Sequence, residues 1–180
     1  MVSINLDSIK TVTKTLPVLL GLVMIGCGDT AQLPPGAEVR ISPAEKEWTI
    51  SPNTQIDQNG FSTCIIDPGY YQDEFVTVSV ADSEGRLIGG AEIILSLNLS
   101  ANTFSGSAVL SLFDDINGDF IPDENELVSG MDDGIYVTTT DKYSGAKNLI
   151  VRMNLSCTYV GQLMVVSGGY SSSATFKTVE

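Results

Sequence analysis

The feature of the sequence that most constrains its fold is a two-residue alternation of apolar side chains, which recurs along most of the chain. Val76, Val78 and Val80 alternate with the polar residues between them. Successive side chains of a β-strand point to opposite faces, so this pattern is typical of a strand with one buried face. Similar runs lie at residues 93–99, 108–112, 135–139, 149–157, 163–167 and 174–179.

The segments between these runs favour turns. Residues 82–85 and 141–145 contain Asp, Ser and Gly, which adopt turn conformations at low cost. No stretch after Cys27 shows a sustained helical period. About seven short strands separated by turns predict an all-β sandwich, and we place this domain at residues 39–180.

Composition excludes several function classes. The chain has 180 residues, of which 43% are hydrophobic, so it can build a core. Its 9 basic and 22 acidic residues give a net charge of −13. A surface this acidic repels phosphate, so we expect no nucleic acid partner. The absence of His excludes Ser-His-Asp and Cys-His catalysis, and no nucleophile is paired with a base. We therefore expect a protein that is not an enzyme.

The N-terminus has the pattern of an export signal. Lys10 and Lys14 precede an apolar run at residues 16–25, which is shorter than the roughly 20 residues that span a bilayer. The run ends in Met-Ile-Gly-Cys at residues 24–27, which resembles the lipobox of bacterial lipoproteins, with Met where Leu is usual. The resemblance implies a signal peptide at 1–26, removed by signal peptidase II, and acylation of Cys27, palmitate included. The alternatives are an ordinary signal peptide or a short buried segment.

The residues after Cys27 bear on location. Gly28 stands where an Asp would favour retention in the inner membrane of enterobacteria, so we expect the outer membrane if the organism is Gram-negative. Multiple acyl chains would make the attachment durable. Residues 27–38 contain a Pro-Pro pair and few apolar side chains, which predicts a tether between lipid and domain.

Two further cysteines remain once Cys27 is assigned to the lipid. An exported compartment is oxidising, so Cys64 and Cys157 are expected to form a disulfide. The alternation at residues 149–157 places Cys157 on the inward face. In the chain-entropy model, closing a loop of this length stabilises the fold by roughly 4–5 kcal/mol. The alternative is two separate buried thiols.

An acidic segment interrupts the strand pattern. Residues 114–133 contain eight acidic side chains and no Lys or Arg. Counting from Asp115, oxygen-bearing groups occupy positions 1, 3, 5, 7, 9 and 12, which are the ligand offsets of an EF-hand-type calcium loop. These residues are Asp115, Asn117, Asp119, Ile121 through its carbonyl, Asp123 and Glu126. Phe120 occupies position 6, where Gly usually provides a sharp turn.

The local sequence of this segment adds a resemblance. Asn-Gly-Asp followed by Ile-Pro-Asp is similar to the calcium repeats of dockerins and thrombospondin type 3 modules. The resemblance implies one structural calcium ion, held with the weak affinity of extracellular modules. The alternative is a solvated acidic loop without a metal ion.

A wider resemblance covers about residues 70–180. Residues 76–93 contain a Val/Thr strand, an Asp-x-x-Gly turn and a second strand, and residues 138–146 and 159–161 continue the pattern. This arrangement resembles a bacterial immunoglobulin-like repeat of the invasin/intimin type, with Leu87-Ile88 where a Pro is usual. The resemblance implies an Ig-like sandwich with a structural or adhesive role.

Together these observations predict a lipid-anchored Ig-like module of the cell envelope that is not an enzyme. We expect it to be an accessory part of a surface or envelope assembly, with a membrane bound through the anchor and an envelope or surface protein as partner. The alternative is a carbohydrate-binding module that contacts a glycan, against which the aromatic content of 7% counts. A metal-dependent hydrolase is disfavoured by the absence of His.

Overall fold

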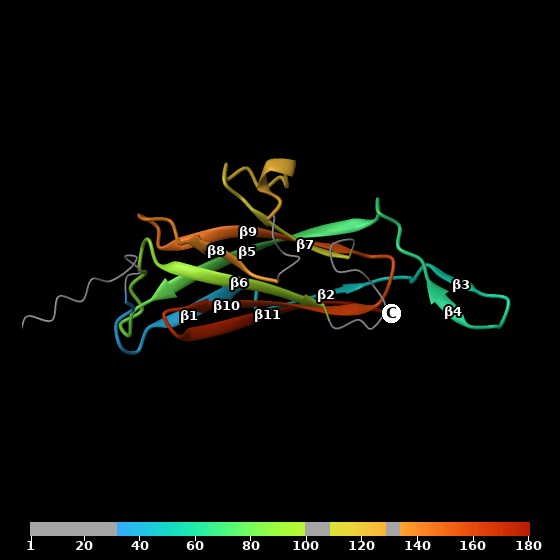
Figure 1. Cartoon of the computed structure of the whole chain (residues 1–180), viewed down its shortest axis with the longest axis horizontal. Coiled ribbons are helices and arrows are strands. Elements are labelled where there is room, and N and C mark those ends of the chain that lie inside the picture. Colours follow the sequence, from blue (N-terminus) through green and yellow to red (C-terminus); the bar gives the residue numbers. More distant parts are fainter. Residues whose placement is uncertain (1–31, 100–108, 129–133) are drawn as a thin grey trace, which may run out of the picture.

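The computed structural model describes residues 32–99, 109–128 and 134–180. Two β-sheets face each other in it, and a separate hairpin extends from one end (Figure 1). Within the described residues, the helical content is one 3-10 turn, η2 (Glu124–Glu126). The prediction of an all-β sandwich is therefore confirmed. None of the helices in these ranges is long and apolar enough to cross a membrane.

The first sheet has four antiparallel strands in the order β1-β5-β9-β7. The second sheet has five strands in the order β2-β11-β10-β6-β8, and β2 runs parallel to β11. The strands of the first sheet are β1 (Glu38–Ser42), β5 (Tyr71–Ala81), β9 (Ala146–Asn154) and β7 (Leu110–Asp114). Those of the second are β2 (Glu45–Thr49), β11 (Tyr170–Val179), β10 (Tyr159–Ser167), β6 (Glu92–Leu99) and β8 (Tyr136–Thr139).

This topology is that of an immunoglobulin-like sandwich. Strands β1, β5, β9 and β7 correspond in order to the A-B-E-D sheet of an Ig domain, and β6, β10 and β11 to its C-F-G sheet. Strands β2 and β8 lengthen the second sheet at its two edges. The seven alternating runs of the sequence fall on β5 to β11, so the two further strands of the facing sheets are β1 and β2.

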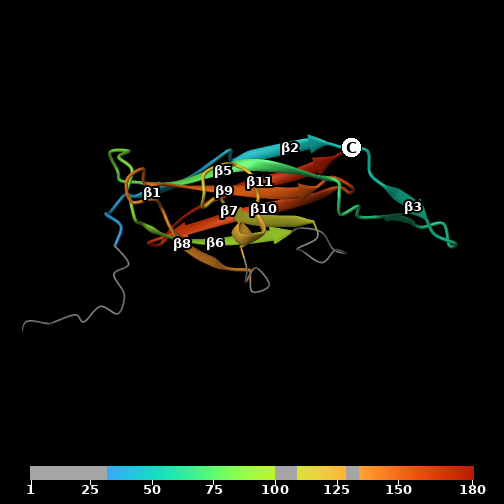
Figure 2. The ribbon, with the colours of Figure 1, turned by 90° about the horizontal axis from the view of Figure 1, so that it is seen from above.

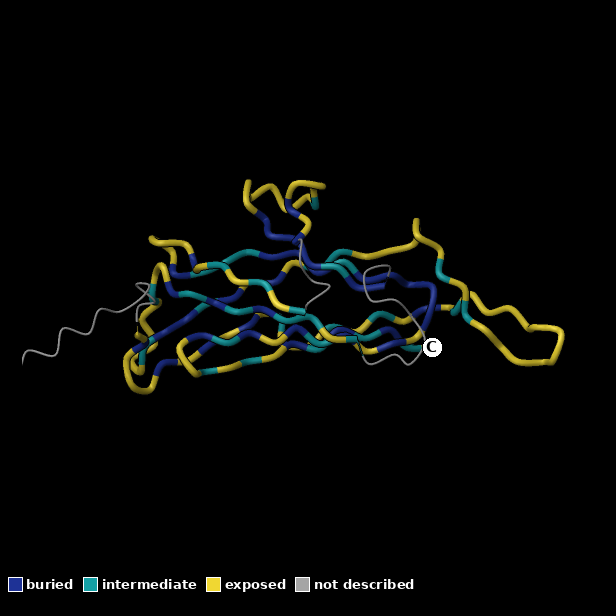
Figure 3. The backbone as a smooth tube through the Cα atoms, viewed as in Figure 1, coloured by how far each residue is buried: buried dark blue, intermediate teal, exposed yellow. Residues whose placement is uncertain are grey.

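The core lies between the two sheets, where alternate side chains of each strand meet. Val76, Val78 and Val80 of β5 are buried, whereas Thr77 between them is exposed. They join one continuous cluster with buried residues of the opposite sheet, among them Ile93 and Phe176. Figure 3 shows this pattern as buried tube along the facing strands. Fully burying each such side chain contributes about 1.5–3 kcal/mol, so this shared face holds the sheets together.

The folded domain begins earlier than the sequence indicated. Residues 27–38 were expected to form a tether, but Leu33 and Ala37 are buried in the core cluster. Pro34 and Ala37 close a turn through a 3.1 Å backbone hydrogen bond, and Leu33 packs beside Gly168 of the β10–β11 turn. The two prolines thus form part of a packed turn. The tether assignment is wrong for residues 33–38, while residues 27–31 lie outside the described ranges.

Strand β8 shows a second difference. Its alternation was expected to mark a half-buried strand, yet Ile135 and Val137 are exposed and the partly buried face carries Tyr136. The strand lies at the edge of the second sheet, where it pairs with β6 among the described strands. The Tyr136 face of the strand points toward the first sheet, where the Tyr136 hydroxyl group donates a 2.8 Å hydrogen bond to Asp114 of β7.

The two ends of the long axis of the sandwich differ in structure. The described chain enters at one end, beside the β5–β6 and β8–β9 turns (Figures 1 and 2). At the opposite end, β3 (Thr54–Ile56) and β4 (Ser62–Cys64) form a two-stranded hairpin that extends past the sheets. We call residues 53–66 the distal hairpin.

Candidate functional site

The acidic loop, residues 115–126, begins at the end of β7, and the residues after it pair with β7 again. It follows β7 at Asp114, and the chain returns as Leu127 pairs with Phe113 in a β-bridge. The N–H group of Val128 then donates a 3.0 Å hydrogen bond to the Leu112 carbonyl. The loop therefore stands on a closed base, and it extends outward from the first sheet (Figures 1 and 3).

Side-chain oxygens hold the first half of this loop in shape. The Oδ1 atom of Asp115 accepts hydrogen bonds from the N–H groups of Gly118 at 3.0 Å and Phe120 at 3.4 Å. Asn117 Oδ1 accepts one from Asp119 N–H, and Asp119 Oδ1 accepts one from Ile121 N–H. The predicted positions 1, 3 and 5 thus each bind backbone groups of the loop.

Glu126 ties the second half of the loop to the first. It is buried, and its Oε1 atom accepts hydrogen bonds from the N–H groups of Ile116 at 2.9 Å and Asn117 at 3.2 Å. Its Oε2 atom accepts a longer one, 3.4 Å, from Asp123 N–H. The predicted position 12 therefore lies beside positions 2 and 3, which brings the ends of the loop together.

Phe120 adopts a left-handed backbone conformation, which Gly adopts more readily than other residues. Its φ is 61°, in the left-handed region that a side chain occupies at a cost of about 1–2 kcal/mol. Its ring packs edge-on against Phe75 of β5, with ring centroids 5.2 Å apart. Such a pair contributes about 0.5–1.5 kcal/mol, which offsets much of the backbone strain. The contact explains how Phe replaces Gly here.

Two adjacent carboxylates at the base of the loop differ in their partners. Asp114 is buried and bonded by Lys147 Nζ at 2.5 Å and by the Tyr136 hydroxyl group at 2.8 Å. Burial, and secondarily Asp114, raises the pKa of Tyr136. Asp115 is also buried, but its Oδ2 atom has no hydrogen-bond partner among the described residues. Sequence reasoning missed Lys147, because it lies on another strand.

The structure brings together only part of the predicted ligand set. Asp115 and Glu126 lie inside the loop, where backbone N–H groups contact them. Asp119 and Asp123 are exposed. Over the ranges that the structure describes, no three His, Cys, Asp or Glu side chains are grouped closely enough to hold a metal ion.

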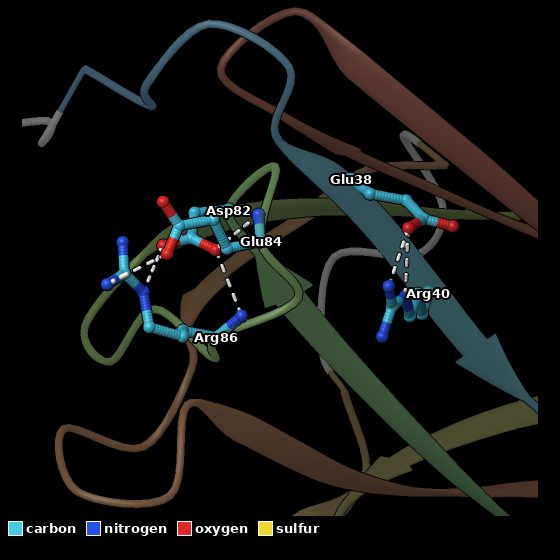
Figure 4. Close-up of polar contacts among 5 residues, drawn as sticks. All are labelled: Glu38, Arg40, Asp82, Glu84 and Arg86. Atoms are coloured by element: carbon cyan, nitrogen blue, oxygen red, sulfur yellow. Dashed lines mark hydrogen bonds and ion pairs between the residues drawn. The ribbon is translucent and has the colours of Figure 1, made fainter.

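The β5–β6 turn shows how another Asp is accommodated (Figure 4). Asp82 Oδ1 accepts 2.9 Å hydrogen bonds from the N–H groups of Glu84 and Arg86. Its Oδ2 atom accepts a 2.8 Å hydrogen bond from the Arg86 side chain. These contacts, the side-chain bond above all, lower the pKa of Asp82. Both oxygens of this carboxylate therefore have partners.

A disulfide attaches the distal hairpin to the sandwich. Cys64 of β4 bonds to Cys157, with their Cα atoms 5.9 Å apart, as the sequence predicted. Cys157 is buried in the core, in line with its expected inward phase. Asp67 N–H donates a 2.9 Å hydrogen bond to Ser156 Oγ beside it. The base of the hairpin is thus fastened to the segment between β9 and β10.

The tip of the distal hairpin exposes apolar side chains. Ile56 is 77% and Phe61 70% exposed. Asp57 Oδ1 closes the tip by accepting 2.8 Å hydrogen bonds from the N–H groups of Asn59 and Phe61. Sequence reasoning missed this element, whose Asp-x-x-Gly turn was the available signal.

The predicted lipid site at Cys27 and the signal peptide at 1–26 lie outside the described residues.

No family model matches the chain, and no curated protein matches it significantly. Among solved structures, a glycosyl hydrolase family 2 member from Bacteroides cellulosilyticus is 11% identical over 81% of this chain, with a TM-score of 0.40. The match covers 14% of that protein's chain. A conjugative transposon lipoprotein from Bacteroides eggerthii is 13% identical, over 82% of this chain and 100% of its own, with a TM-score of 0.38.

The N-terminal domain of a Streptococcus gordonii adhesin is 10% identical, over 82% of this chain and 33% of that chain, with a TM-score of 0.31. These likenesses are too distant to assign a family or an activity.

Proposed function

We propose that the chain is a lipid-anchored Ig-like module of the cell envelope that is not an enzyme and that holds its distal hairpin away from the membrane for a protein partner. The observation that carries the proposal is the placement of the chain entry and the distal hairpin at opposite ends of the sandwich (Figure 1). An anchor at one end and an exposed apolar element at the other suit a presenting role.

The length of chain before the domain supports this orientation. Five residue-to-residue steps, across residues 28–31, lead from Cys27 to residue 32, where the described chain begins. At roughly 3.3–3.6 Å per residue they span at most about 18 Å. Acylation at Cys27 would therefore keep the entry end close to the lipid, with the hairpin directed outward. Outer-membrane attachment in a Gram-negative cell remains part of this proposal.

The chemistry of the hairpin indicates the kind of partner. Ile56 and Phe61 offer apolar surface. Residues 53–70 contain Asp57 and Asp67 but no Lys or Arg. The whole chain carries a charge of −13, which attracts basic surfaces. We therefore propose a protein partner with an apolar pocket bordered by Lys or Arg.

The exposed aromatic residues favour a protein over a glycan. A glycan-binding surface needs rings that are open for stacking on sugars. Tyr71 is instead covered by the guanidinium of Arg152, 3.9 Å from its ring centroid. Phe75 packs on Phe120, and Trp48 stacks on Phe176 with ring centroids 6.5 Å apart. All five of these rings, the Trp48 indole included, thus make contacts within the protein itself, whereas the rings of Phe61 and Tyr143 are open.

The anchor is tested by replacing the lipid site. Full-length chain should sediment with membranes, and mass spectrometry should find an acylated N-terminal Cys27. The Cys27→Ser variant should lose the lipid and move to the soluble fraction. Wild-type protein that is soluble, or that begins at another residue, would contradict the anchor.

The partner is tested by site-specific crosslinking in intact cells. A photo-crosslinking residue at Phe61 should give one discrete protein adduct, which Ile56→Asp abolishes. The same residue at Tyr143, in the turn at the entry end, should give no such adduct, although Tyr143 is 92% exposed. Equal adducts at both positions, or polysaccharide pull-down by the purified chain, would contradict a protein-binding hairpin.

A further inference from the structure

The acidic loop contains a buried carboxylate oxygen that lacks a partner. Asp115 is 7% exposed, and no hydrogen bond reaches its Oδ2 atom within the described residues. The carboxylate lies inside the loop, because its Oδ1 atom contacts the backbone of Gly118 and Phe120. An unpaired buried charge is costly, so this oxygen requires a compensating group.

The protein supplies no cation for it from nearby sequence. Residues 114–133 contain no Lys or Arg. Lys147 comes from β9, but its ammonium group is 2.5 Å from Asp114. Lys142 and Lys147 line the same pocket as Asp115, but neither forms an ion pair with it among the described residues, which leaves room for a bound cation from solution.

The donors around the loop define the type of cation. They are all oxygens, from three aspartates, one glutamate, the Asn117 amide and the Ile121 carbonyl. Hard oxygen donors of this kind suit calcium, which accepts six to eight oxygen ligands in a flexible geometry. We propose that the acidic loop binds one calcium ion through Asp115, Asn117, Asp119, Ile121, Asp123 and Glu126.

The loop already has the backbone turn that this binding needs. Position 6 of such a loop requires a sharp turn, and Phe120 makes it with a φ of 61°. Asp115 and Glu126, at positions 1 and 12, are inside the loop. Asp119 and Asp123 are exposed, so binding requires their side chains to rotate inward. This rotation accounts for the lack of a preformed group of three acidic ligands in the described ranges.

The ion would stabilise the edge of the first sheet. The base of the loop pairs with β7 through Phe113 and Leu127, so closing the loop also fixes the end of that edge strand. This role is independent of the lipid anchor and of the distal hairpin. The calcium proposal can therefore be wrong while the proposed envelope function is right. Equally, the envelope function can be wrong while the loop binds calcium.

The test is calcium binding by the full chain purified in detergent and stripped of metal with a chelator. Modules of this kind bind calcium with a Kd of roughly 10⁻⁴ to 10⁻³ M. At about 10 mM calcium chloride we expect titration calorimetry to show one site and the melting temperature to rise by about 3–10 °C. Magnesium should raise it less, because it resists dehydration and demands octahedral geometry.

Three variants locate the site. Asp115→Asn should remove most of the rise in melting temperature. Asp119→Asn should also remove most of it, and because Asp119 is exposed, this substitution should leave the fold intact. Asp57→Asn, which removes the same charge from the distal hairpin, should keep the full response. The absence of heat and of a thermal shift with wild-type chain would overturn the proposal. An equal shift with magnesium or with potassium chloride at matched ionic strength, or a full response in Asp119→Asn, would also overturn it.

Discussion

The turn at Asp82 and the acidic loop at Asp115 use the same local bonding but balance charge differently. In each, the Oδ1 atom of an Asp accepts two backbone N–H groups that follow it in the sequence. In the turn, the Oδ2 atom is bonded by Arg86 four residues later. In the loop, the Oδ2 atom of Asp115 lacks any partner in the described part of the chain.

Backbone hydrogen bonds shape both segments in the same way. The segments differ in where the nearest basic side chain lies in the sequence. The Asp82 turn carries its own Arg, whose side chain is exposed while Asp82 is partly buried. The acidic loop carries none, so the charge at its base depends on Lys147, which β9 provides. The turn is electrostatically complete on its own, whereas the loop depends on groups outside its own sequence.

Removing Lys147 should have the largest effect on stability. Its ammonium group bonds Asp114, whose side chain is almost fully buried. Lys147→Met leaves that carboxylate without its cation and should lower the free energy of unfolding by about 3 kcal/mol, as measured by urea denaturation. Lys177→Met is the control, because Lys177 bonds the more exposed Glu45 and Glu47, so its loss should change stability much less than the loss of Lys147. Similar losses in both variants would contradict the dependence on β9.

Glu126→Gln should have the next largest effect. The buried carboxylate accepts three backbone N–H groups, and the amide places a donor where Oε2 accepts from Asp123. We expect a loss of about 1–2 kcal/mol by thermal unfolding in chelator. Glu84→Gln, in the exposed Asp82 turn, should change stability by less than about 0.5 kcal/mol. A neutral Glu126→Gln would mean that these hydrogen bonds do not hold the loop.

The sequence predicted those parts of the molecule that depend on near neighbours. The alternation at Val76, Val78 and Val80 identified β5 because side-chain direction along a strand depends only on position. The offsets of the acidic loop indicated a sharp turn at Phe120 for the same reason, and its φ is 61°. Both the alternation and this turn are local properties of the backbone. The role of Asp115 as a metal ligand stays a prediction.

The remaining features depend on residues that meet only after folding. Lys147 reaches Asp114 because β9 pairs with β7, and Phe75 contacts Phe120 from β5. The Pro-Pro segment indicated a tether because its composition is polar, but Leu33 finds a packing site beside Gly168. Sequence spacing within one segment contains no signal for such contacts.

The ring pair at Phe120 gives a smaller effect that separates strain from packing. Phe120→Gly removes about 1 kcal/mol of backbone strain but also removes the contact with Phe75, so we expect a net change below about 1 kcal/mol in thermal unfolding. Phe75→Ala loses the same contact without relieving the strain and should be more destabilising. If Phe120→Gly lowers the melting temperature more than Phe75→Ala does, the Phe120 ring must stabilise the fold through contacts other than the one with Phe75.

The smallest effect concerns the pH dependence of the Asp82 turn. The Arg86 side chain, followed by its backbone N–H, holds the pKa of Asp82 below the ordinary value of 3.8 in the folded state. A depressed carboxyl pKa stabilises the fold above the unfolded value and loses that contribution as the pH falls through the folded value. Wild type should therefore be slightly more stable than Asp82→Asn at pH 6, and the gap in melting temperature should close below about pH 3. The gap should be small, because the Arg86 side chain is solvent-exposed and the ion pair is screened.

Melting temperatures of both proteins from pH 6 to pH 2, in chelator to remove any metal contribution from the acidic loop, measure this gap. A gap that widens as the pH falls would mean that Asp82 is destabilising when charged, and the contrast with the acidic loop would then have the wrong sign.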